Sequence, residues 1–403
     1  MEFSQNIADL SPSATMAVSA LARRLRAEGK DVINLSAGEP DFDTPGWISD
    51  AAVRGLREGG TRYTPPAGLP ELREAAAESL ARLAPGGERS FRSDEIVVSC
   101  GAKHSLFNAC FSLFGPGDEV LVAAPYWTSY PEIVKLARAA PVFVKGPEAR
   151  DFRLAPDDLE ARLTPRTKGL ILCSPGNPTG AVYSADELRA VAEWAKARSV
   201  WLVSDEIYRS IYFGRGGPNR APSILDLPAG SLGPAVLVDG LSKAFAMTGW
   251  RIGFTWSSAA VASRMAALQS HTTSNPATPS QFAALEALRS PERAERDIGE
   301  MRKAFLRRRD LAVSLMEQHL PGLSYVRPEG AFYLFFRIDG TLGAEVTTSE
   351  AWCQRVLEES GVAVVPGSAF GDDRYVRLSF ATSDEMLSEA MRRMGAVVSA
   401  VRS

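Results

Sequence analysis

The sequence has few of the residues that build metal sites, disulfide frameworks or hydrolase triads. Among 403 residues there are three histidines and four cysteines, and no two cysteines stand in a CxxC spacing. A zinc centre, a disulfide scaffold and a Ser-His-Asp triad are therefore poor interpretations. We expect a reduced intracellular protein without a metal site, in which the cysteines are small core residues.

Strong charge of one sign and long hydrophobic runs are also missing. The formal net charge is -3, so no basic field attracts nucleic acid or an anionic membrane. No stretch of eighteen apolar residues occurs, and we expect no membrane span. The N-terminus has no secretory pattern, which makes the cytoplasm the expected location. One basic cluster, Arg302, Lys303, Arg307, Arg308 and Arg309, has helical spacing and is interpreted as a solvated helix face.

What is present is the composition of a globular protein, with 45% apolar and 23% charged residues. Short, continuously apolar runs alternate with helical patterns in the middle of the chain, as buried parallel strands alternate with helices. This pattern predicts a doubly wound α/β sheet. The five runs are Ile96–Ser99, Val120–Ala123, Gly169–Cys173, Val200–Val203 and Ala235–Val238.

The length favours two domains. We predict a large domain over residues 46–285 and a smaller α+β domain formed by residues 1–45 together with 286–403. The smaller one would contain long helices and strands near Ala331–Ile338 and Tyr375–Phe380. Residues 213–234 are rich in glycine and proline and are interpreted as a surface loop.

Polar residues gather just after the five predicted strands. Ligands of open parallel sheets bind beyond the carboxyl ends of the strands, so these residues would share one crevice. They are, strand by strand, Gly101, Ala102 and Lys103; Trp127; Asn177; Asp205 and Tyr208; and Ser242, Lys243 and Arg251.

The reactive end of this set suits pyridoxal 5'-phosphate. A pyridine aldehyde needs a lysine for an imine, and Lys243 is available. A carboxylate such as Asp205 would keep the ring nitrogen protonated, which makes the ring a better electron sink. Trp127 could supply an apolar plate for the ring, although an aromatic residue after a strand is often a core residue.

The remaining groups suit the other polar atoms of the same cofactor. Asn177 and Tyr208 could donate hydrogen bonds to the ring oxygen. The phosphate would need backbone N–H groups at a helix N-terminus and a cation. A helix that begins near Lys103, together with the guanidinium of Arg251, meets both needs.

Several motifs in one order resemble the class I aminotransferases of fold type I, from about Pro12 to Thr382. The resemblance is strongest to the bacterial aspartate aminotransferase subgroup, which includes prephenate aminotransferases. It implies a large domain with a mostly parallel doubly wound sheet and a smaller α+β domain. The segments that carry it are Ser36–Asp41, Ser174–Gly180, Ser204–Tyr208 and Ser242–Gly253.

The resemblance implies a role for each site residue in cofactor binding. Gly101, Ala102 and Arg251 would hold the phosphate, with Lys103 beside them at the helix start. Tyr63, in a proline-rich segment, would reach the phosphate of the neighbouring subunit, so the active site would need a homodimer. Lys243, Asp205 and Tyr208 would be the catalytic residues.

The resemblance also implies a substrate site. Arg377 would grip the substrate α-carboxylate with its planar fork, and the backbone of Gly38 would approach the same group. Trp127 and Asn177 would contact the substrate as well. In the aspartate subgroup the position of Lys103 helps to recognise a distal carboxylate, whereas a solvated helix residue is the alternative for this lysine.

Two positions depart from the family pattern. Relatives often have a serine three residues before the lysine, as a phosphate ligand, and Gly240 stands there, so Ser242 or the backbone would compensate. The aspartate subgroup often has a basic residue where Ser11 stands. With Lys103 kept and that residue absent, a preference for dicarboxylates is plausible rather than secured.

These observations predict a ping-pong amino transfer between an L-amino acid, aspartate-like in preference, and 2-oxoglutarate. Aromatic amino acids, prephenate or alanine remain alternative substrates. A carbon–sulfur β-lyase could use the same cofactor machinery on the same scaffold. A cofactor-binding regulator is the least favoured alternative, because such proteins usually carry a fused DNA-binding domain, for which we expect no room here.

Overall fold

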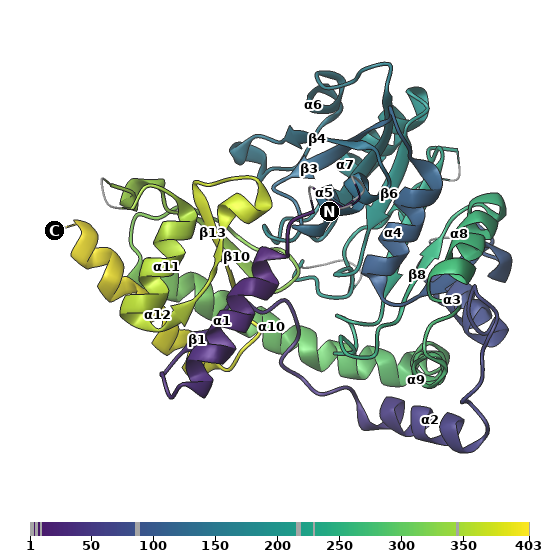
Figure 1. The fold of residues 1–403 in the computed structure, drawn as a ribbon, viewed down its shortest axis with the longest axis horizontal. Helices are drawn as coiled ribbons and strands as arrows, with labels where there is room; N and C mark the ends of the chain where they lie inside the picture. Colours follow the sequence, from purple (N-terminus) through teal and green to yellow (C-terminus); the bar gives the residue numbers. More distant parts are fainter. Residues whose placement is uncertain are drawn as a thin grey trace.

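The chain is described from a computed structural model, in which the elements gather into a larger and a smaller part joined by one long helix (Figure 1). The larger part is built on a seven-stranded sheet of order β2-β8-β7-β6-β5-β3-β4. None of the described helices is long and apolar enough to cross a lipid bilayer. The structure describes residues 4, 7–8, 10–84, 89–214, 219–228, 230–343 and 346–402.

The five predicted strands all lie in this sheet and run in one direction, so their carboxyl ends meet at one edge. The sequence pattern missed two strands. β8 is short and lies antiparallel between β2 and β7, and β4 is a part-exposed edge strand parallel to β3. The strands are β2 (Ile96–Ser99), β3 (Glu119–Ala124), β4 (Ala140–Lys145), β5 (Thr167–Cys173), β6 (Trp201–Asp205), β7 (Ala235–Gly240) and β8 (Gly253–Trp256).

Helices cover both faces of the sheet, and the core alternates along each strand. Leu202 belongs to one hydrophobic cluster and its neighbour Val203 to the cluster on the opposite face. Such two-sided burial explains why these strands are continuously apolar. The helices of this part are α2 (Gly46–Arg57), α3 (Pro70–Leu83), α4 (Ala102–Leu113), α5 (Ser129–Leu136), α6 (Pro156–Glu160), α7 (Ala185–Ala197), α8 (Ala259–Thr272) and α9 (Thr278–Arg289).

The smaller part has its own buried cluster, which includes Phe305, Tyr333 and Trp352. Its strands form an antiparallel sheet of order β12-β13-β10-β9 and a parallel pair, β1 with β11. The elements are α1 (Ala14–Ala27), β1 (Ile33–Asn34), α10 (Pro291–His319), β9 (Tyr325–Val326), β10 (Tyr333–Arg337), α11 (Ser349–Ser360), β11 (Val362–Ala363), β12 (Val365–Pro366), β13 (Tyr375–Ser379) and α12 (Asp384–Arg402).

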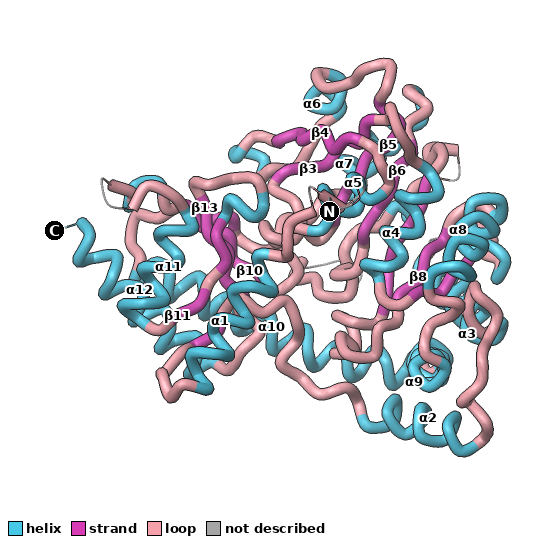
Figure 2. The backbone as a smooth tube through the Cα atoms, viewed as in Figure 1, coloured by secondary structure: helices cyan, strands magenta, loops and turns pink. Residues whose placement is uncertain are grey.

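One helix links the two parts. α10 runs along both, and Ile298 near its start packs against the core of each (Figure 2). Because β1 pairs with β11, the N-terminal segment lies within the smaller part. This arrangement is the α/β fold expected of fold type I, while the domain limits at residues 46 and 285 stay a prediction.

The interpretation of the basic cluster as a solvated face is wrong for two of its members. Arg308 and Arg309 are each only 8% exposed. Arg308 forms an ion pair with Asp41 at 2.7 Å, and Arg309 donates to the carbonyl of Pro328 at 2.8 Å. Helical spacing alone could not reveal these partners, which come from segments distant in sequence.

The surface-loop interpretation of residues 213–234 is also wrong in part. Ala221, Ile224, Leu225 and Leu227 are buried, and the last three belong to the core of the larger part. Ile224 and Leu225 lie within a short 3-10 turn, Ile224–Asp226, and Leu227 follows it. Residues 215–218 and 229 of this segment lie outside the described residues.

Candidate functional site

A cavity of about 560 Å³ lies where the carboxyl ends of β5, β6 and β7 face the smaller part. Side chains of α1, β10 and β13 complete its wall, so both parts of the molecule contribute to it. The predicted site residues that line it are Gly38, Ala102, Lys103, Trp127, Asn177, Asp205, Tyr208, Ser242, Lys243, Arg251 and Arg377.

Lys243 follows β7 and projects its amine into this cavity. The Nζ atom donates a hydrogen bond to the carbonyl of Gly38. Desolvation by burial lowers the pKa of Lys243 to about 8, although the carboxylate of Glu39 acts in the opposite direction. At pH 7 about one molecule in ten would then carry a neutral amine at this position, far more than for an ordinary lysine.

Asp205 ends β6 and is only 3% exposed. One carboxylate oxygen accepts a hydrogen bond of 2.7 Å from the hydroxyl of Tyr130, and the other accepts one of 3.2 Å from the N–H of Ile207. Desolvation raises the pKa of Asp205 to about 6, while the bond from Tyr130 opposes that rise. A cation brought against this carboxylate would therefore be strongly favoured.

Arg377 is a buried guanidinium without a carboxylate partner among the described residues. It donates to the amide oxygen of Asn177 at 3.0 Å and to the carbonyl of Ser36 at 2.8 Å. Its Nε atom has no hydrogen-bond partner within the described chain. Desolvation lowers the pKa of Arg377, and an anion delivered by a ligand would offset the cost of burying this charge.

Arg377 is also held between two aromatic rings. Its guanidinium carbon lies 4.4 Å from the ring centre of Tyr333 and 4.9 Å from that of Phe370. The rings fix the plane of the fork, and the bond to Asn177 turns the amide oxygen of that residue toward the arginine. The amide NH2 of Asn177 is thereby left to donate to a ligand.

Tyr208 and Tyr333 form a hydroxyl pair in the cavity wall, with 2.7 Å between their oxygens. Tyr208 was predicted from its position after β6, and Tyr333 was not. Tyr333 stands in a strand with a strongly apolar sequence, so the pattern marks it as a core residue. If Tyr208 donates its proton to a ligand, Tyr333 is in place to donate to Tyr208.

The start of α4 and Arg251 form the most positive end of the site. Gly101 precedes the helix with φ of +87°, and a Cβ atom there would lie 2.7 Å from a guanidinium nitrogen of Arg251. Glycine is therefore required for this close approach. The first N–H groups of a helix have no partner within the helix, which makes this end a site for an anion.

Gly240 has a packing reason to be a glycine. A Cβ atom there would lie 3.0 Å from the Cα of Gly253, on the adjacent strand β8, and 3.0 Å from the carbonyl oxygen of Ile252, which precedes that strand. A serine at this position would need the neighbouring atoms to shift by a few tenths of an ångström. Ser242 lines the cavity instead and is the hydroxyl available at this end.

Lys103 and Trp127 form one wall together. The Nζ atom of Lys103 lies 5.0 Å from the ring centre of Trp127. Desolvation lowers the pKa of Lys103, and the neighbouring charge of Arg251 acts in the same direction. Lys103 lines the cavity and is also exposed to solvent, so its role at a distal carboxylate stays a prediction.

The opposite wall comes from α1 and was not predicted. Thr15, Ser19 and Arg23 line the cavity at a spacing of four residues, which places them on one helix face. The hydroxyl of Ser19 lies 2.8 Å from that of Ser36, whose carbonyl accepts from Arg377. The polar spacing was visible in the sequence, but nothing there indicated which face meets the site.

Two predicted residues do not line the cavity. Gly101 lies directly behind Arg251, as described above. Tyr63 stands in the loop between α2 and α3 and is 89% exposed. The structure of one chain therefore does not bring Tyr63 to this chain's own site.

Comparisons with known proteins agree with this geometry. A family model described as aminotransferase class I and II matches residues 30–394. The aspartate aminotransferase of Geobacillus stearothermophilus is 42% identical over 395 residues, which cover 98% of each chain. A probable aspartate/prephenate aminotransferase of Aquifex aeolicus is 43% identical over 391 residues, 96% of each chain. The structure of Thermus thermophilus aspartate aminotransferase with maleate superposes with a TM-score of 0.91 at 41% identity, covering 98% of this chain and all of that one.

Proposed function

The chain belongs to the class I and II aminotransferase family, and we propose that it uses pyridoxal 5'-phosphate to move an amino group between an aspartate-like L-amino acid and 2-oxoglutarate. One observation carries this proposal. A largely buried lysine and a buried carboxylate stand at neighbouring strand ends, in a cavity that also holds the guanidinium of Arg377, which has no carboxylate partner among the described residues.

The residues present fit this cofactor. Lys243 has the lowered pKa that imine formation with an aldehyde requires, and Asp205 offers a desolvated carboxylate for a protonated ring nitrogen. The N-terminus of α4 and Arg251 offer a phosphate cradle. Asn177 and Tyr208 can donate to the ring oxygen, and the indole of Trp127 faces the same cavity.

Pyridoxal phosphate, when bound, supplies an electron-accepting ring that stabilises negative charge at the substrate Cα. The chain does the rest. Lys243 would hold the cofactor covalently; once the substrate amine takes its place, its freed Nζ would carry the Cα proton as general acid and base. Asp205 would keep the ring nitrogen protonated. Arg377 would fix the α-carboxylate, so that the Cα–H bond points at Lys243.

The cations at the cavity wall support dicarboxylate substrates. Lys103 lines the cavity with its Nζ atom 5.0 Å from the ring centre of Trp127, and Arg23 approaches from α1. Arg23 has no ion pair among the described residues, whereas the neighbouring Arg24 pairs with Glu28 on the outer side of the helix. With Arg377 occupied by the α-carboxylate, Lys103 and Arg23 are the cations left for a second carboxylate.

A panel of amino donors with 2-oxoglutarate tests the proposal. We expect a visible absorbance band with pyridoxal phosphate, amino transfer from aspartate, and slower transfer from alanine. Lys103→Ala should raise the KM for aspartate and leave that for alanine unchanged. An unchanged KM for aspartate would remove Lys103 from the substrate site. Ammonia and pyruvate released from cystathionine without an oxo acid would instead identify a β-lyase.

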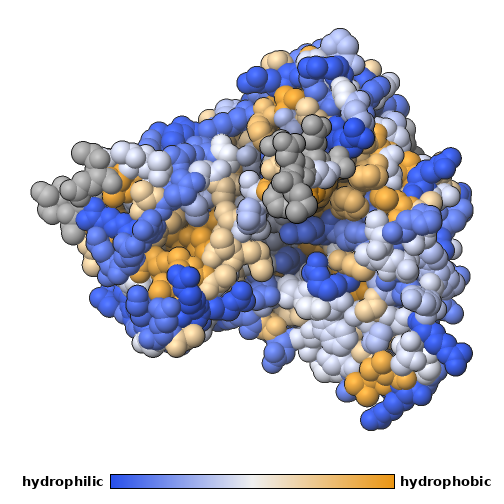
Figure 3. Space-filling model, in the orientation of Figure 1, coloured by the Kyte–Doolittle hydropathy of each residue, from blue (hydrophilic) through white to orange (hydrophobic). Residues whose placement is uncertain are grey.

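A homodimer with shared sites is part of the proposal. Tyr63 is too exposed to have a role in the cavity of its own chain. Such exposure in a single chain is expected of a residue that completes the site of a partner subunit. Figure 3 shows an apolar patch over the adjacent α2, where Val53 and Leu56 are exposed. Such patches mark interaction surfaces. The cytoplasmic location stays a prediction from the sequence.

Mixing two inactive variants tests the shared site. In a mixed dimer of Lys243→Ala and Tyr63→Ala chains, one of the two sites regains both wild-type residues. We therefore expect activity to return on mixing after reversible dissociation. If light scattering shows a monomer, or if mixing restores nothing, Tyr63 does not serve a partner.

A further inference from the structure

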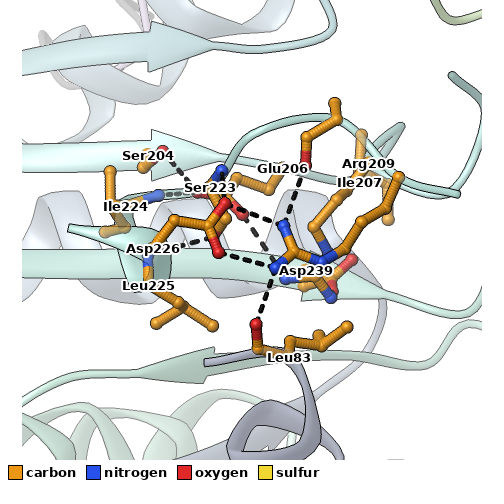
Figure 4. A network of polar contacts seen from close by, with 12 residues as sticks. Leu83, Ser204, Glu206, Ile207, Arg209, Ser223, Ile224, Leu225, Asp226 and Asp239 are labelled. Atoms are coloured by element: carbon orange, nitrogen blue, oxygen red, sulfur yellow. Dashed lines mark hydrogen bonds and ion pairs between the residues drawn. The ribbon is translucent and has the colours of Figure 1, made fainter. Parts of the chain in front are cut away.

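Behind the cavity, the ends of β6 and β7 carry a second group of charges. Side chains alternate along a strand, so Glu206 points away from the cavity that its neighbour Asp205 faces. Asp239 lies on the adjacent strand β7, and the N–H of Glu206 donates to the carbonyl of Val238 at 2.9 Å. Two carboxylates thus meet on the rear side of the site (Figure 4).

Arg209 joins these two carboxylates. It donates to Glu206 at 3.4 Å and to Asp239 in a closer contact. All three side chains are buried, with residue exposures of 1% for Glu206, 6% for Arg209 and 7% for Asp239. The other carboxylate oxygen of each is also satisfied: that of Glu206 by Ser204 and the N–H of Ile224, and that of Asp239 by the N–H of Gly240.

The position of this clamp connects it to the reactive groups. Glu206 is the next residue after Asp205, and Lys243 stands four residues after Asp239. Arg209 therefore ties the strand that presents the carboxylate to the strand that leads to the amine. It also supplies the only guanidinium that balances Glu206 and Asp239 among the described residues.

Charge reaches Asp205 from both sides. Burial is the main reason for its raised pKa, and the negative charges of Asp239 and Glu206 raise it further. The groups that face or adjoin Asp205 are Tyr130 of α5, Cys173 of β5, Glu206 and Asp239 at the strand ends, and Lys243 across the cavity. Burial raises the pKa values of Glu206 and Asp239, and the charge of Arg209 acts in the opposite direction on both.

We propose that Arg209 is a positioning residue, and this proposal rests on the proposed function. Arg209 keeps Asp205 ionised toward the cofactor ring. It also holds the strand end that carries Asp205 against the strand that leads to Lys243. Arg209 is not among the residues that line the cavity. Without its charge, two buried carboxylates beside Asp205 would lose their counter-ion. Their repulsion would disfavour a third ionised carboxylate in the same region.

Arg209→Met removes the charge and keeps the length of the side chain. We expect the dissociation constant of pyridoxal phosphate, followed by its visible absorbance at pH 7.5, to rise at least tenfold. The pH below which affinity falls should move up by about one unit, because Asp205 takes up a proton more readily. Arg209→Lys keeps the charge and should recover most of both properties.

Arg220→Met is the matched control. Arg220 lies nearby with a side chain that is 14% exposed, but it pairs with Asp226 and donates to the carbonyl of Leu83 rather than to the strand ends. We expect it to lower the thermal midpoint while leaving the cofactor affinity and its pH midpoint unchanged. Equal effects of the two variants on the pH midpoint would overturn the proposal.

Arg209→Met with Glu206→Gln keeps the test decisive if the single variant fails to fold. Glutamine preserves the acceptor for Ser204 and Ile224 and removes one uncompensated charge. The pH midpoint should return toward that of the wild type. If the pH midpoint of cofactor binding in Arg209→Met stays at the wild-type value, the role of Arg209 is refuted and the proposed function is not affected. A wild-type protein that does not bind pyridoxal phosphate would refute the proposed function itself.

Discussion

The β6 and β7 strand ends carry carboxylates and cations on both of their sides, but the two sides differ in how completely these charges are paired. On the cavity side, Asp205 and Lys243 are desolvated and have shifted pKa values, and no ion pair joins them within the described chain. Arg377 completes this side with an Nε atom that has no partner among the described residues.

On the rear side, every charge has a counter-charge. Arg209 pairs with both Glu206 and Asp239, and the remaining carboxylate oxygens accept further hydrogen bonds. Buried ion pairs of this kind contribute little net stability, yet breaking one is strongly destabilising. The comparison teaches that fully paired charges hold the strand ends in place on the rear side. On the cavity side the charged groups lack full pairing, and this is the side where we propose that a ligand binds.

Replacing Lys243 should produce the largest effect and would break the comparison on the cavity side. Lys243→Ala should abolish the visible absorbance of the bound cofactor and lower turnover by about 10⁴-fold or more, because both the covalent link and the proton carrier are lost. Absorbance spectra and steady-state rates measure this. Lys303→Ala, an exposed lysine of α10, is the control and should change neither. A Lys243→Ala protein that keeps colour and turnover would end the proposal.

Arg377→Lys should have the next largest effect. Lysine keeps the charge but lacks the planar fork, so kcat/KM for the amino donor should fall by about 100-fold. The visible absorbance of the cofactor should persist, since Arg377 faces the substrate rather than the ring. Arg374→Lys serves as control, because Arg374 is a part-exposed residue of the same region that pairs with Asp372 and Glu148. Similar losses in both variants would contradict a substrate role.

The pH dependence of cofactor capture tests whether Lys243 on the cavity side has the lowered pKa described above. The pKa of Lys243 is lowered to about 8, so its neutral amine becomes more abundant as the pH rises and saturates above that value. The rate at which the apo chain captures pyridoxal phosphate should rise by nearly tenfold per pH unit below 8 and then level off.

Glu39→Gln tests the direction in which a neighbouring charge moves the midpoint of that profile. The carboxylate of Glu39 raises the pKa of Lys243, so its removal should move the midpoint to lower pH. Stopped-flow absorbance at several pH values gives both midpoints. A midpoint near 10 would show that Lys243 is not desolvated as described, and a shift to higher pH in Glu39→Gln would show that Glu39 does not raise the pKa of Lys243.

Arg23 should show the smallest effect. Arg23→Ala should raise the KM for dicarboxylates by about twofold to fivefold, which is the range of an exposed ion pair, and high salt should erase the difference. Arg24→Ala changes the adjacent arginine, whose partner is Glu28, and should have no effect. Calorimetry can compare the binding of succinate, a dicarboxylate, with that of propionate, a monocarboxylate, in both variants without turnover. Equal binding of succinate to both variants would exclude Arg23 from the site.

The sequence predicted the sheet and the cavity side well, for a physical reason. A buried parallel strand must be apolar on both faces, and its carboxyl end must present the ligand groups, so runs such as Gly169–Cys173 locate residues such as Asn177. β8 escaped detection because its four residues, Gly253–Trp256, do not form a continuous apolar run.

The rest depended on pairings between distant segments. Tyr130 is 75 positions from Asp205 and lies on a helix, and Tyr333 is 125 positions from Tyr208 in a strand that reads as core. Arg209 is separated from Asp239 by 30 positions. No local pattern announces such partners, because each residue alone is compatible with an ordinary core or surface position.

The pairing of β1 with β11 fixes the order in which the site can be assembled during synthesis. Ile33 and Asn34 leave the ribosome early, but their partners Val362 and Ala363 are made only near the end. Asp205 and Lys243 are translated well before Arg377. A growing chain therefore contains the lysine and the carboxylate proposed to bind the cofactor long before it contains the arginine proposed to bind the substrate.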